Sequence, residues 1–195
     1  MTTTTKTTKF VSLGDRFSVL PVILLTVVAL ALGWWLKSSV ENRGLAFSNG
    51  GFTAQTPVGW LVEKPGGSEV LRATDRTASG FGTTYLIQKQ AAQANAKPAD
   101  VASLLTLDRG NNLTGYRVLK QQDVLVQGRP AMQVEYVYVE SAANLTHAVI
   151  PAVVHGLDYI FVDSGKAVIV TYRADQSNFD TDLARFNRFL LSVKY

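Results

Sequence analysis

One segment of the chain is apolar throughout, whereas the rest alternates between apolar and polar positions. Residues 17–36, FSVLPVILLTVVALALGWWL, form a run of twenty residues without a charged side chain. A helix rises 1.5 Å per residue, so a run of this length matches the roughly 30 Å hydrocarbon core of a bilayer. The pattern predicts one transmembrane helix over residues 17–36.

Residues typical of a membrane interface flank the predicted span. Arg16 precedes it, Trp34 and Trp35 close it, and Lys37 follows. Indole rings and flanking charges at headgroup depth hold a helix in the bilayer. Three Lys/Arg residues lie before the span, and two lie shortly after it beside one carboxylate. Because positive charge favours the cytoplasmic side, this bias predicts an N-terminus inside and a C-terminal domain on the extracytoplasmic side of the plasma membrane.

A cleaved signal peptide is the alternative, since Ala29-Leu30-Ala31 resembles a small-x-small cleavage site. The apolar run continues five residues beyond Ala31 and ends in two tryptophans. That is longer than the usual hydrophobic region of a signal peptide, so we expect a permanent tether. The Thr-rich residues 1–16 are expected to form a disordered tail inside the cell, and residues 37–49 a polar stalk.

Residues 50–195 carry shorter apolar segments that are interrupted by turn residues. Four early segments are expected to be strands: 51–56, 61–64, 69–74 and 83–90. Two hairpins are expected later, each across a Gly-containing turn: 124–127 with 132–139, and 157–162 with 166–172. In the second arm of the first hairpin, Met132, Val134, Tyr136 and Tyr138 alternate with Gln133, Glu135, Val137 and Val139. The first of these two faces is therefore expected to be the more apolar one at the start of the strand.

Two helices accompany these strands. A short one over residues 98–107 is predicted by Pro98, which suits a first turn, and by an apolar stripe of Val101, Leu104 and Leu105. A closing helix, capped by Asp175 or Ser177, places apolar residues at spacings of four and three: Phe179, Leu183, Phe186, Leu190 and Val193. The order of elements predicts an antiparallel α+β layer structure rather than a parallel βαβ one.

Charge and cysteine content exclude several functions. The net charge of +4 divides into +2 for residues 1–16 and +2 for residues 37–195, and no two basic residues are adjacent. A nucleic-acid-binding protein concentrates Lys and Arg in runs or on one face, so nucleic acid is not an expected partner. The chain has no cysteine, which excludes disulfides, a thiolate metal site and a thiol nucleophile.

The layout of residues 50–195 resembles that of the PsbP-like family, which is named for an extrinsic subunit of photosystem II and includes a Ran-GTPase release factor and bacterial lipoproteins. The residues that carry the resemblance are a P-x-G-W turn and the aromatic residues of the closing helix: Pro57, Gly59, Trp60, Phe179, Phe186 and Phe189. The resemblance implies an α/β/α sandwich around a central antiparallel sheet that docks on a larger assembly, usually without catalysis. Because the domain is expected to carry its own membrane helix, no manganese or calcium role is transferred.

Candidate catalytic residues are few. The chain has two histidines, His147 and His155, and His155 lies three positions before Asp158. An imidazole near a carboxylate could serve in catalysis, but no G-x-S-x-G motif or other activated serine accompanies it. We therefore expect a protein that is not an enzyme, with no catalytic, cofactor-binding or metal-binding residue.

The sequence favours a non-catalytic, single-pass accessory subunit that docks on and stabilises a larger membrane-protein complex. Its expected partners are the lipid bilayer and integral membrane proteins. The alternative is a membrane-tethered ligand-binding module with a pocket between sheet and helix. Four residues are candidates for that pocket or for docking: Trp60, Tyr136, Tyr138 and His155.

Overall fold

The computed structural model describes residues 13–41, 44–77, 81–140 and 151–195, and within its first helix it describes the side chains of residues 21–36 and Ser39. The chain divides into two compact units, Met1–Arg43 and Gly44–Tyr195. Residues 1–12 of the expected tail, the side chains of Arg16 and Lys37, and His147 lie outside the described residues.

The first unit contains one helix, α1 (Leu13–Glu41), which is 29 residues long and includes Pro21. Thr26 Oγ1 donates a hydrogen bond of 2.8 Å to the carbonyl oxygen of Val22, one turn earlier. Within the described part of the chain, no helix has both the length and the apolar character needed to cross a membrane. The span expected at residues 17–36 stays a prediction.

The segment expected to be a polar stalk, residues 37–49, includes the end of α1, which continues to Glu41. It also includes strand β1 (Gly44–Asn49), which pairs antiparallel with β2 (Phe52–Pro57). Gly50 and Gly51, which connect the two strands, both have positive φ, 57° and 85°. Two such residues form the type I′ turn that suits a tight hairpin. The Gly-Gly pair was therefore a hairpin signal, which the polar composition of this segment concealed.

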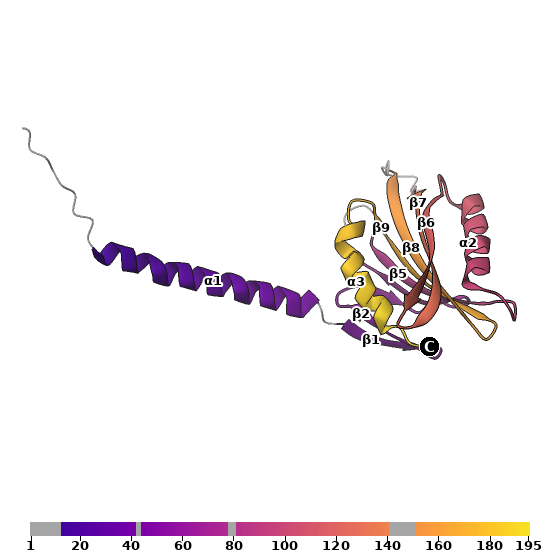
Figure 1. Cartoon of the computed structure of the whole chain (residues 1–195), viewed down its shortest axis with the longest axis horizontal. Helices are drawn as coiled ribbons and strands as arrows, with labels where there is room; N and C mark the ends of the chain where they lie inside the picture. Colours follow the sequence, from indigo (N-terminus) through magenta and orange to yellow (C-terminus); the bar gives the residue numbers. More distant parts are fainter. Residues whose placement is uncertain (1–12, 42–43, 78–80, 141–150) are drawn as a thin grey trace, which may run out of the picture. The chain divides into compact units, whose positions relative to one another are not determined.

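The second unit is built on an antiparallel sheet of seven strands (Figure 1). In spatial order the strands are β3 (Leu61–Glu63), β4 (Glu69–Thr74), β5 (Thr84–Ala91), β9 (Lys166–Asp175), β8 (Ala152–Asp163), β7 (Arg129–Glu140) and β6 (Arg117–Val126). The strands expected from the sequence are present, and the arms of both late hairpins are longer than predicted. The alternation along β7 is confirmed, because its four even-numbered residues from Met132 to Tyr138 are all buried.

Helices cover both faces of the sheet, which confirms the mixed α+β class (Figure 1). Helix α3 (Phe179–Ser192) packs on β9 and β2, and its core contains most of the aromatic residues of the domain. Helix α2 (Pro98–Asn112) packs on β7 and β8 over a second, separate core. The sheet therefore divides the domain into an α3 side and an α2 side.

The two helix termini differ from the predictions. Asn178 occupies the N-cap position of α3 and makes no side-chain capping bond. Asp175, expected as a cap, instead accepts hydrogen bonds from Ser177 N (3.0 Å) and Ser177 Oγ (2.7 Å). Helix α2 extends to Asn112 rather than residue 107. Its polar last turn looks like a terminus in the sequence, but Arg109 in that turn is buried in the domain.

Candidate functional site

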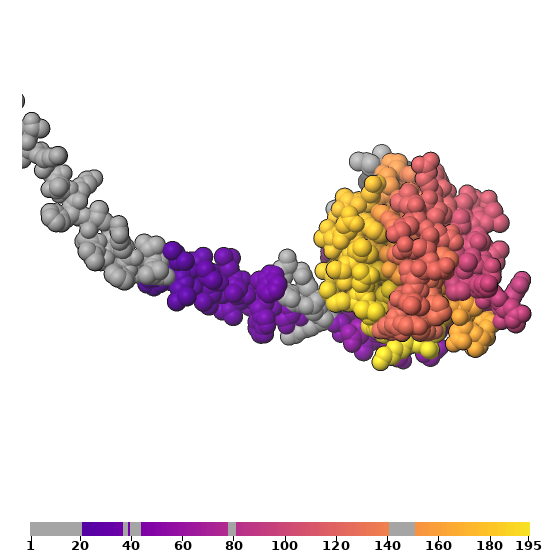
Figure 2. Space-filling view, in the orientation of Figure 1, coloured from indigo at the N-terminus to yellow at the C-terminus, as the bar shows by residue number. Residues whose placement is uncertain are grey.

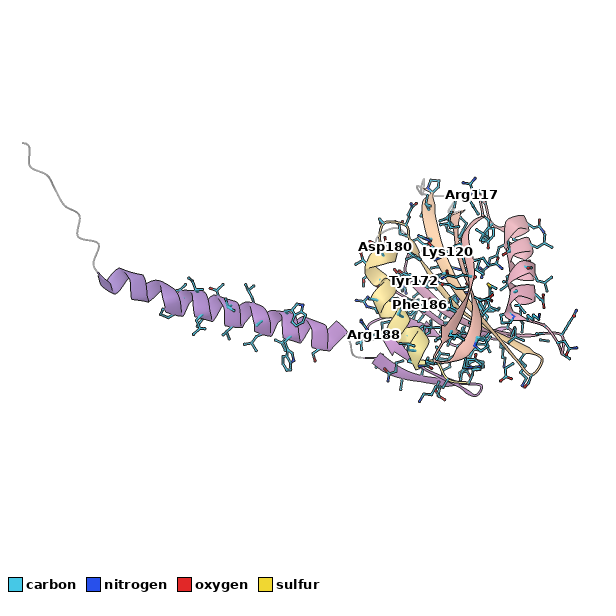
Figure 3. The ribbon with its side chains drawn as sticks, viewed as in Figure 1. Arg117, Lys120, Tyr172, Asp180, Phe186 and Arg188 are labelled. Atoms are coloured by element: carbon cyan, nitrogen blue, oxygen red, sulfur yellow. The ribbon has the colours of Figure 1, made fainter. Side chains whose placement is uncertain are left out.

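Trp60 lies in the core on the α3 side. Its ring packs on Tyr85 with centroids 4.5 Å apart, and Tyr85 in turn contacts Phe186 and Phe189 of α3 at 5.4 and 4.9 Å. Tyr172 and Phe186 stack between the sheet and the helix at 5.0 Å (Figure 3). Aromatic rings therefore surround Trp60 in this core.

Tyr136 and Tyr138 are buried on the opposite side of the sheet, under α2. The ring of Tyr136 occupies the space above Gly156 of β8, where an added Cβ would come within 2.3 Å of the ring. The pocket expected between Trp60 and these tyrosines is therefore not formed. The physical reason is that Trp60 and the even-numbered residues of β7 belong to cores that the sheet separates.

His155 is positioned by packing rather than by a catalytic partner. Its Nε2 lies 2.8 Å from Glu135 Oε1, and its ring stacks on Phe179 of α3 with centroids 3.5 Å apart and planes 10° apart. Asp158 is three residues further along β8, so its side chain points to the other face of the sheet. The imidazole and the carboxylate considered for an enzyme are therefore held apart by the strand.

Asp158 belongs to a buried polar network that joins α2 to the sheet. Its Oδ1 accepts a hydrogen bond from Thr171 Oγ1 (2.7 Å), and both carboxylate oxygens pair with the Arg109 guanidinium, Nη2 lying 3.3 Å from Oδ1. The guanidinium carbon lies 4.6 Å from the centroid of the Tyr136 ring. Burial lowers the pKa of Arg109, but the charge of Asp158, its hydrogen bonds to the guanidinium and the nearby Tyr136 and Tyr116 together hold the pKa above its ordinary value. In this network the Arg109 charge is paired with the Asp158 carboxylate, and the guanidinium lies over the Tyr136 ring. Its role is therefore to hold α2 on the sheet.

Trp34 and Trp35, the predicted interface anchors, are both exposed on α1. All eleven large apolar side chains described between Val22 and Leu36 are exposed, by between 49% and 73%. Leaving such a side chain in water costs about 1.5–3 kcal/mol of free energy compared with burying it fully. Burial of this stretch against an apolar surface would therefore be favourable.

A surface that the sequence did not predict lies on α2 and the edge strand β6. Four leucines on these two elements are at least half exposed: Leu104 (67%), Leu107 (65%), Leu119 (50%) and Leu125 (75%). Figure 2 shows α2 and β6 side by side on one face of the domain. A groove of about 390 Å³ between them is lined by Leu125, Pro98 and Pro130, among others. We call these leucines and this groove the α2–β6 surface.

Two features of the α2–β6 surface are typical of protein docking. Leu104, expected to face the core with Val101, points to solvent instead, while Val101 is buried. In addition, β6 is ten residues long and has no strand on its outer side within the described parts of the chain. Exposed leucines and a long unpaired strand edge both favour association with another protein. Arg117 and Lys120 lie on the same strand (Figure 3).

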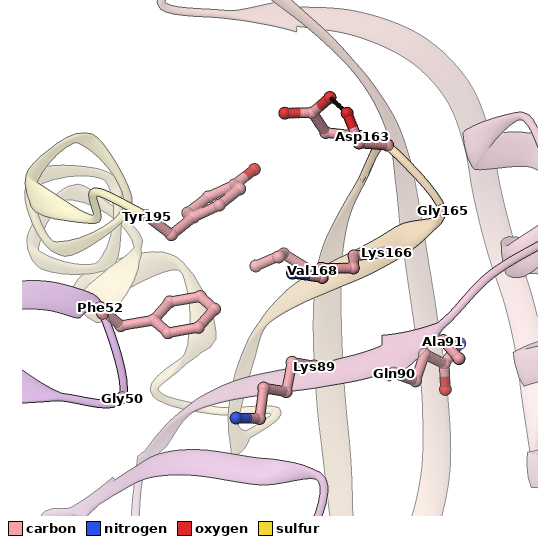
Figure 4. Close-up of a pocket in the computed structure, with 12 residues that line it drawn as sticks. Gly50, Phe52, Lys89, Gln90, Ala91, Asp163, Gly165, Lys166, Val168 and Tyr195 are labelled. Atoms are coloured by element: carbon pink, nitrogen blue, oxygen red, sulfur yellow. Dashed lines mark hydrogen bonds between the residues drawn. The ribbon is translucent and has the colours of Figure 1, made fainter. Parts of the chain in front are cut away.

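A second hollow, which we call the terminal pocket, lies where four segments meet on the α3 side (Figure 4). It has a volume of about 720 Å³ and is lined by the β1–β2 turn, the end of β5, the β8–β9 turn and Tyr195. That volume falls within the range of small-molecule sites, roughly 300–1,000 Å³. None of the four candidate pocket or docking residues from the sequence lines this pocket, because its wall is assembled from turns that are distant in the chain.

Comparison with known proteins identifies the fold. No protein-family model matches the sequence, and no curated protein matches it significantly. The solution structure of cyanobacterial PsbP (CyanoP) from Synechocystis sp. PCC 6803 is similar at a TM-score of 0.57 with 14% identity, over 78% of this chain and 92% of that one. PA94, a protein of unknown function from Pseudomonas aeruginosa, is similar at a TM-score of 0.50 with 11% identity, over 79% of this chain and 98% of that one. At these identities the likeness concerns the fold alone, and the domain has a PsbP-like fold.

Proposed function

We propose that this protein is a membrane-tethered accessory subunit. In this proposal α1 crosses the plasma membrane once with the N-terminus inside. The extracytoplasmic domain then docks, without catalysis, on a larger complex of integral membrane proteins. The observation that carries the proposal is the uninterrupted exposure of the eleven large apolar side chains of α1 between Val22 and Leu36. Lipid tails or partner helices would cover that surface.

The sequence around α1 supports the same proposal. The uncharged run at residues 17–36 has the length of a membrane span. The paired indoles of Trp34 and Trp35 suit the headgroup level at the far end of that run. The small excess of positive charge before the run favours an N-terminus inside.

The α2–β6 surface supports docking by the domain. Exposed leucines on α2 and β6 lie beside a long strand edge, a combination that suits a protein partner better than a small ligand. The PsbP-like fold is compatible with this role, since the family resemblance implies docking on a larger assembly without catalysis. We assign no reaction to the domain.

Copurification tests the docking part of the proposal. Membranes that contain the full chain are solubilised in a mild detergent, and the complexes are resolved on a native gel. We expect the chain to migrate with larger membrane proteins. The double variant Leu104→Gln/Leu107→Gln should reduce the copurified partner roughly tenfold, because two exposed apolar contacts are lost.

The matched control is Leu191→Gln, which alters an exposed leucine of α3 outside the α2–β6 surface. It should leave the copurified amount unchanged. A chain that migrates alone under mild detergent would contradict docking, as would equal losses in the double variant and the control. Topology is tested separately, because protease added to intact cells should degrade the domain if it lies outside.

A further inference from the structure

Two lysines define the charge of the terminal pocket. Lys89 of β5 pairs in register with Val168 of β9, and Lys166 lies two residues before Val168. Because side chains alternate along a strand, the side chains of both lysines emerge on the same face of the sheet as Val168. Neither lysine has an ion-pair partner within 4.0 Å among the residues that the structure describes.

One carboxylate faces these two lysines. Asp163 lies opposite Lys166 in the β8–β9 register, and it accepts a hydrogen bond of 2.9 Å from Ser164 Oγ. The side chains that line the pocket therefore carry two positive charges and one negative charge, a net charge of +1. A single carboxylate is a poor cage for a divalent cation, which takes several oxygen ligands. The two lysine ammonium groups favour an anion instead.

The opposite wall of the pocket is aromatic. The rings of Phe52 and Tyr195 are stacked, with centroids 5.4 Å apart and planes 25° apart. The Arg129 guanidinium lies 4.2 Å from the centroid of the Tyr195 ring. Val168, which is buried, also lines the pocket (Figure 4). A ligand with a flat apolar group could therefore contact rings and aliphatic carbon on one side while its charge meets the lysines.

A backbone hydrogen bond and a tight turn hold together the segments that frame the pocket. The Ala92 amide donates a hydrogen bond of 2.9 Å to the Gly165 carbonyl, which ties the end of β5 to the β8–β9 turn. Ser164 and Gly165 have φ of 48° and 75°, as a tight type I′ hairpin turn requires. Gly50, in the β1–β2 turn, lies beside the Lys89 ammonium. Sites on such fixed elements lose little free energy to ordering when a ligand binds.

We propose that the terminal pocket binds a small organic anion that carries a planar apolar group, such as an aromatic carboxylate, sulfonate or phosphate ester. Lys89 and Lys166 hold the anionic group, and Phe52 and Tyr195 contact the planar part. This inference goes beyond docking, because the pocket shares no lining residue with the leucines of the α2–β6 surface. It does not require the membrane tether.

Chemical-shift titration of the isotope-labelled full chain in detergent micelles tests the proposal. The probe is naphthalene-2-sulfonate, and the neutral comparison compound is 2-naphthalenemethanol. We expect saturable shifts in the amides of Gly50, Gly51, Ser164 and Gly165 with the sulfonate, and much smaller shifts with the alcohol. Lys89→Met and Lys166→Met should each weaken binding about three- to fivefold, as expected for partly exposed charge pairs, and the double variant by about tenfold or more.

Two control variants separate the charge from folding and from non-specific binding. Lys166→Arg keeps the positive charge and should retain binding within about twofold, whereas Lys120→Met removes an exposed lysine of β6 and should have no effect. Both lysines of the pocket are exposed, so their substitution leaves the core intact, and unchanged amide shifts elsewhere confirm the fold. Equal binding of the neutral alcohol, no saturable shift in the pocket, or equal affinity of the double variant would overturn the proposal.

Discussion

Replacing Arg109 tests whether a buried ion pair holds α2 to the sheet. The side chains of Arg109 and Asp158 are 7% and 1% exposed. Arg109→Met keeps the apolar stem of the side chain but leaves the Asp158 carboxylate buried, with one hydrogen bond from Thr171 Oγ1. Loss of one partner from a buried pair costs about 3–5 kcal/mol. A domain of this size is stable by about 5–15 kcal/mol, so the variant should lose a large share of its stability.

A second substitution separates the effect of charge from the effect of packing. In Arg109→Met/Asp158→Asn no charge is buried, and the oxygen of the introduced side-chain amide can still accept a hydrogen bond from Thr171. Removal of both members of a buried pair is far less costly than removal of one. We therefore expect the double variant to regain at least about 2 kcal/mol relative to Arg109→Met, which is a large coupling energy between neighbouring residues.

Urea unfolding in a mild detergent measures these free energies. The chain has three tryptophans, Trp34, Trp35 and Trp60. A background with Trp34→Phe and Trp35→Phe leaves Trp60, in the α3-side core, as the only indole reporter. Arg117→Met, at an exposed arginine of β6, is the matched control and should change the unfolding free energy by less than about 0.5 kcal/mol. A cost below about 1 kcal/mol for Arg109→Met, or a double variant no more stable than the single one, would refute this reasoning.

Three further predictions concern the buried tyrosine and the loop before α3. Gly156→Ala should destabilise the domain by about 1–3 kcal/mol or more in urea unfolding, because the new Cβ would overlap the buried Tyr136 ring. Burial raises the pKa of Tyr136 to about 12, above its unfolded value of about 10. The stability that this neutral phenol contributes should be complete below pH 10 and lost as the pH rises towards 12, and Tyr136→Phe should flatten that decline in unfolding measurements. Hydrogen bonds from the Ser177 hydroxyl and amide lower the pKa of Asp175. The stability that the ionised Asp175 carboxylate contributes to the folded domain is therefore present above its unfolded pKa and is lost as the pH falls through the folded pKa. A titration followed by nuclear magnetic resonance should show the Asp175 pKa rising towards its ordinary value in Ser177→Ala.

Local periodicity predicted the parts of the fold that bury a regular face. The alternation from Met132 to Tyr138 and the spacing of Phe179 and Phe186 each identified buried positions correctly. These patterns are reliable because a strand or helix that packs on one face must repeat its apolar residues with the period of the backbone. The prediction for the apolar stripe of α2 is wrong at Leu104, which is exposed, since a helix with few apolar residues does not define its buried side uniquely.

The candidate site was less accessible to sequence reasoning, because its residues converge only through topology. Trp60 and Tyr136 are both aromatic and buried, yet they occupy opposite sides of the sheet. The separation of His155 from Asp158 could have been predicted, since residues three apart on a strand point to opposite faces. The meeting of Lys89 with Lys166 depends on the pairing of β5 with β9, which no local pattern encodes.

Alkaline carbonate extraction of membranes from cells that express the full chain, followed by mass measurement of the intact polypeptide, tests the tether most directly. We predict a polypeptide of the full 21.2 kDa that stays in the carbonate-resistant membrane pellet. Leu25→Arg, which places a charge near the middle of residues 17–36, should shift the chain towards the supernatant, since a central arginine costs about 2.5–3.5 kcal/mol in membrane insertion. Recovery of the natural chain in the aqueous supernatant, with a mass that begins after Ala31, would contradict the account.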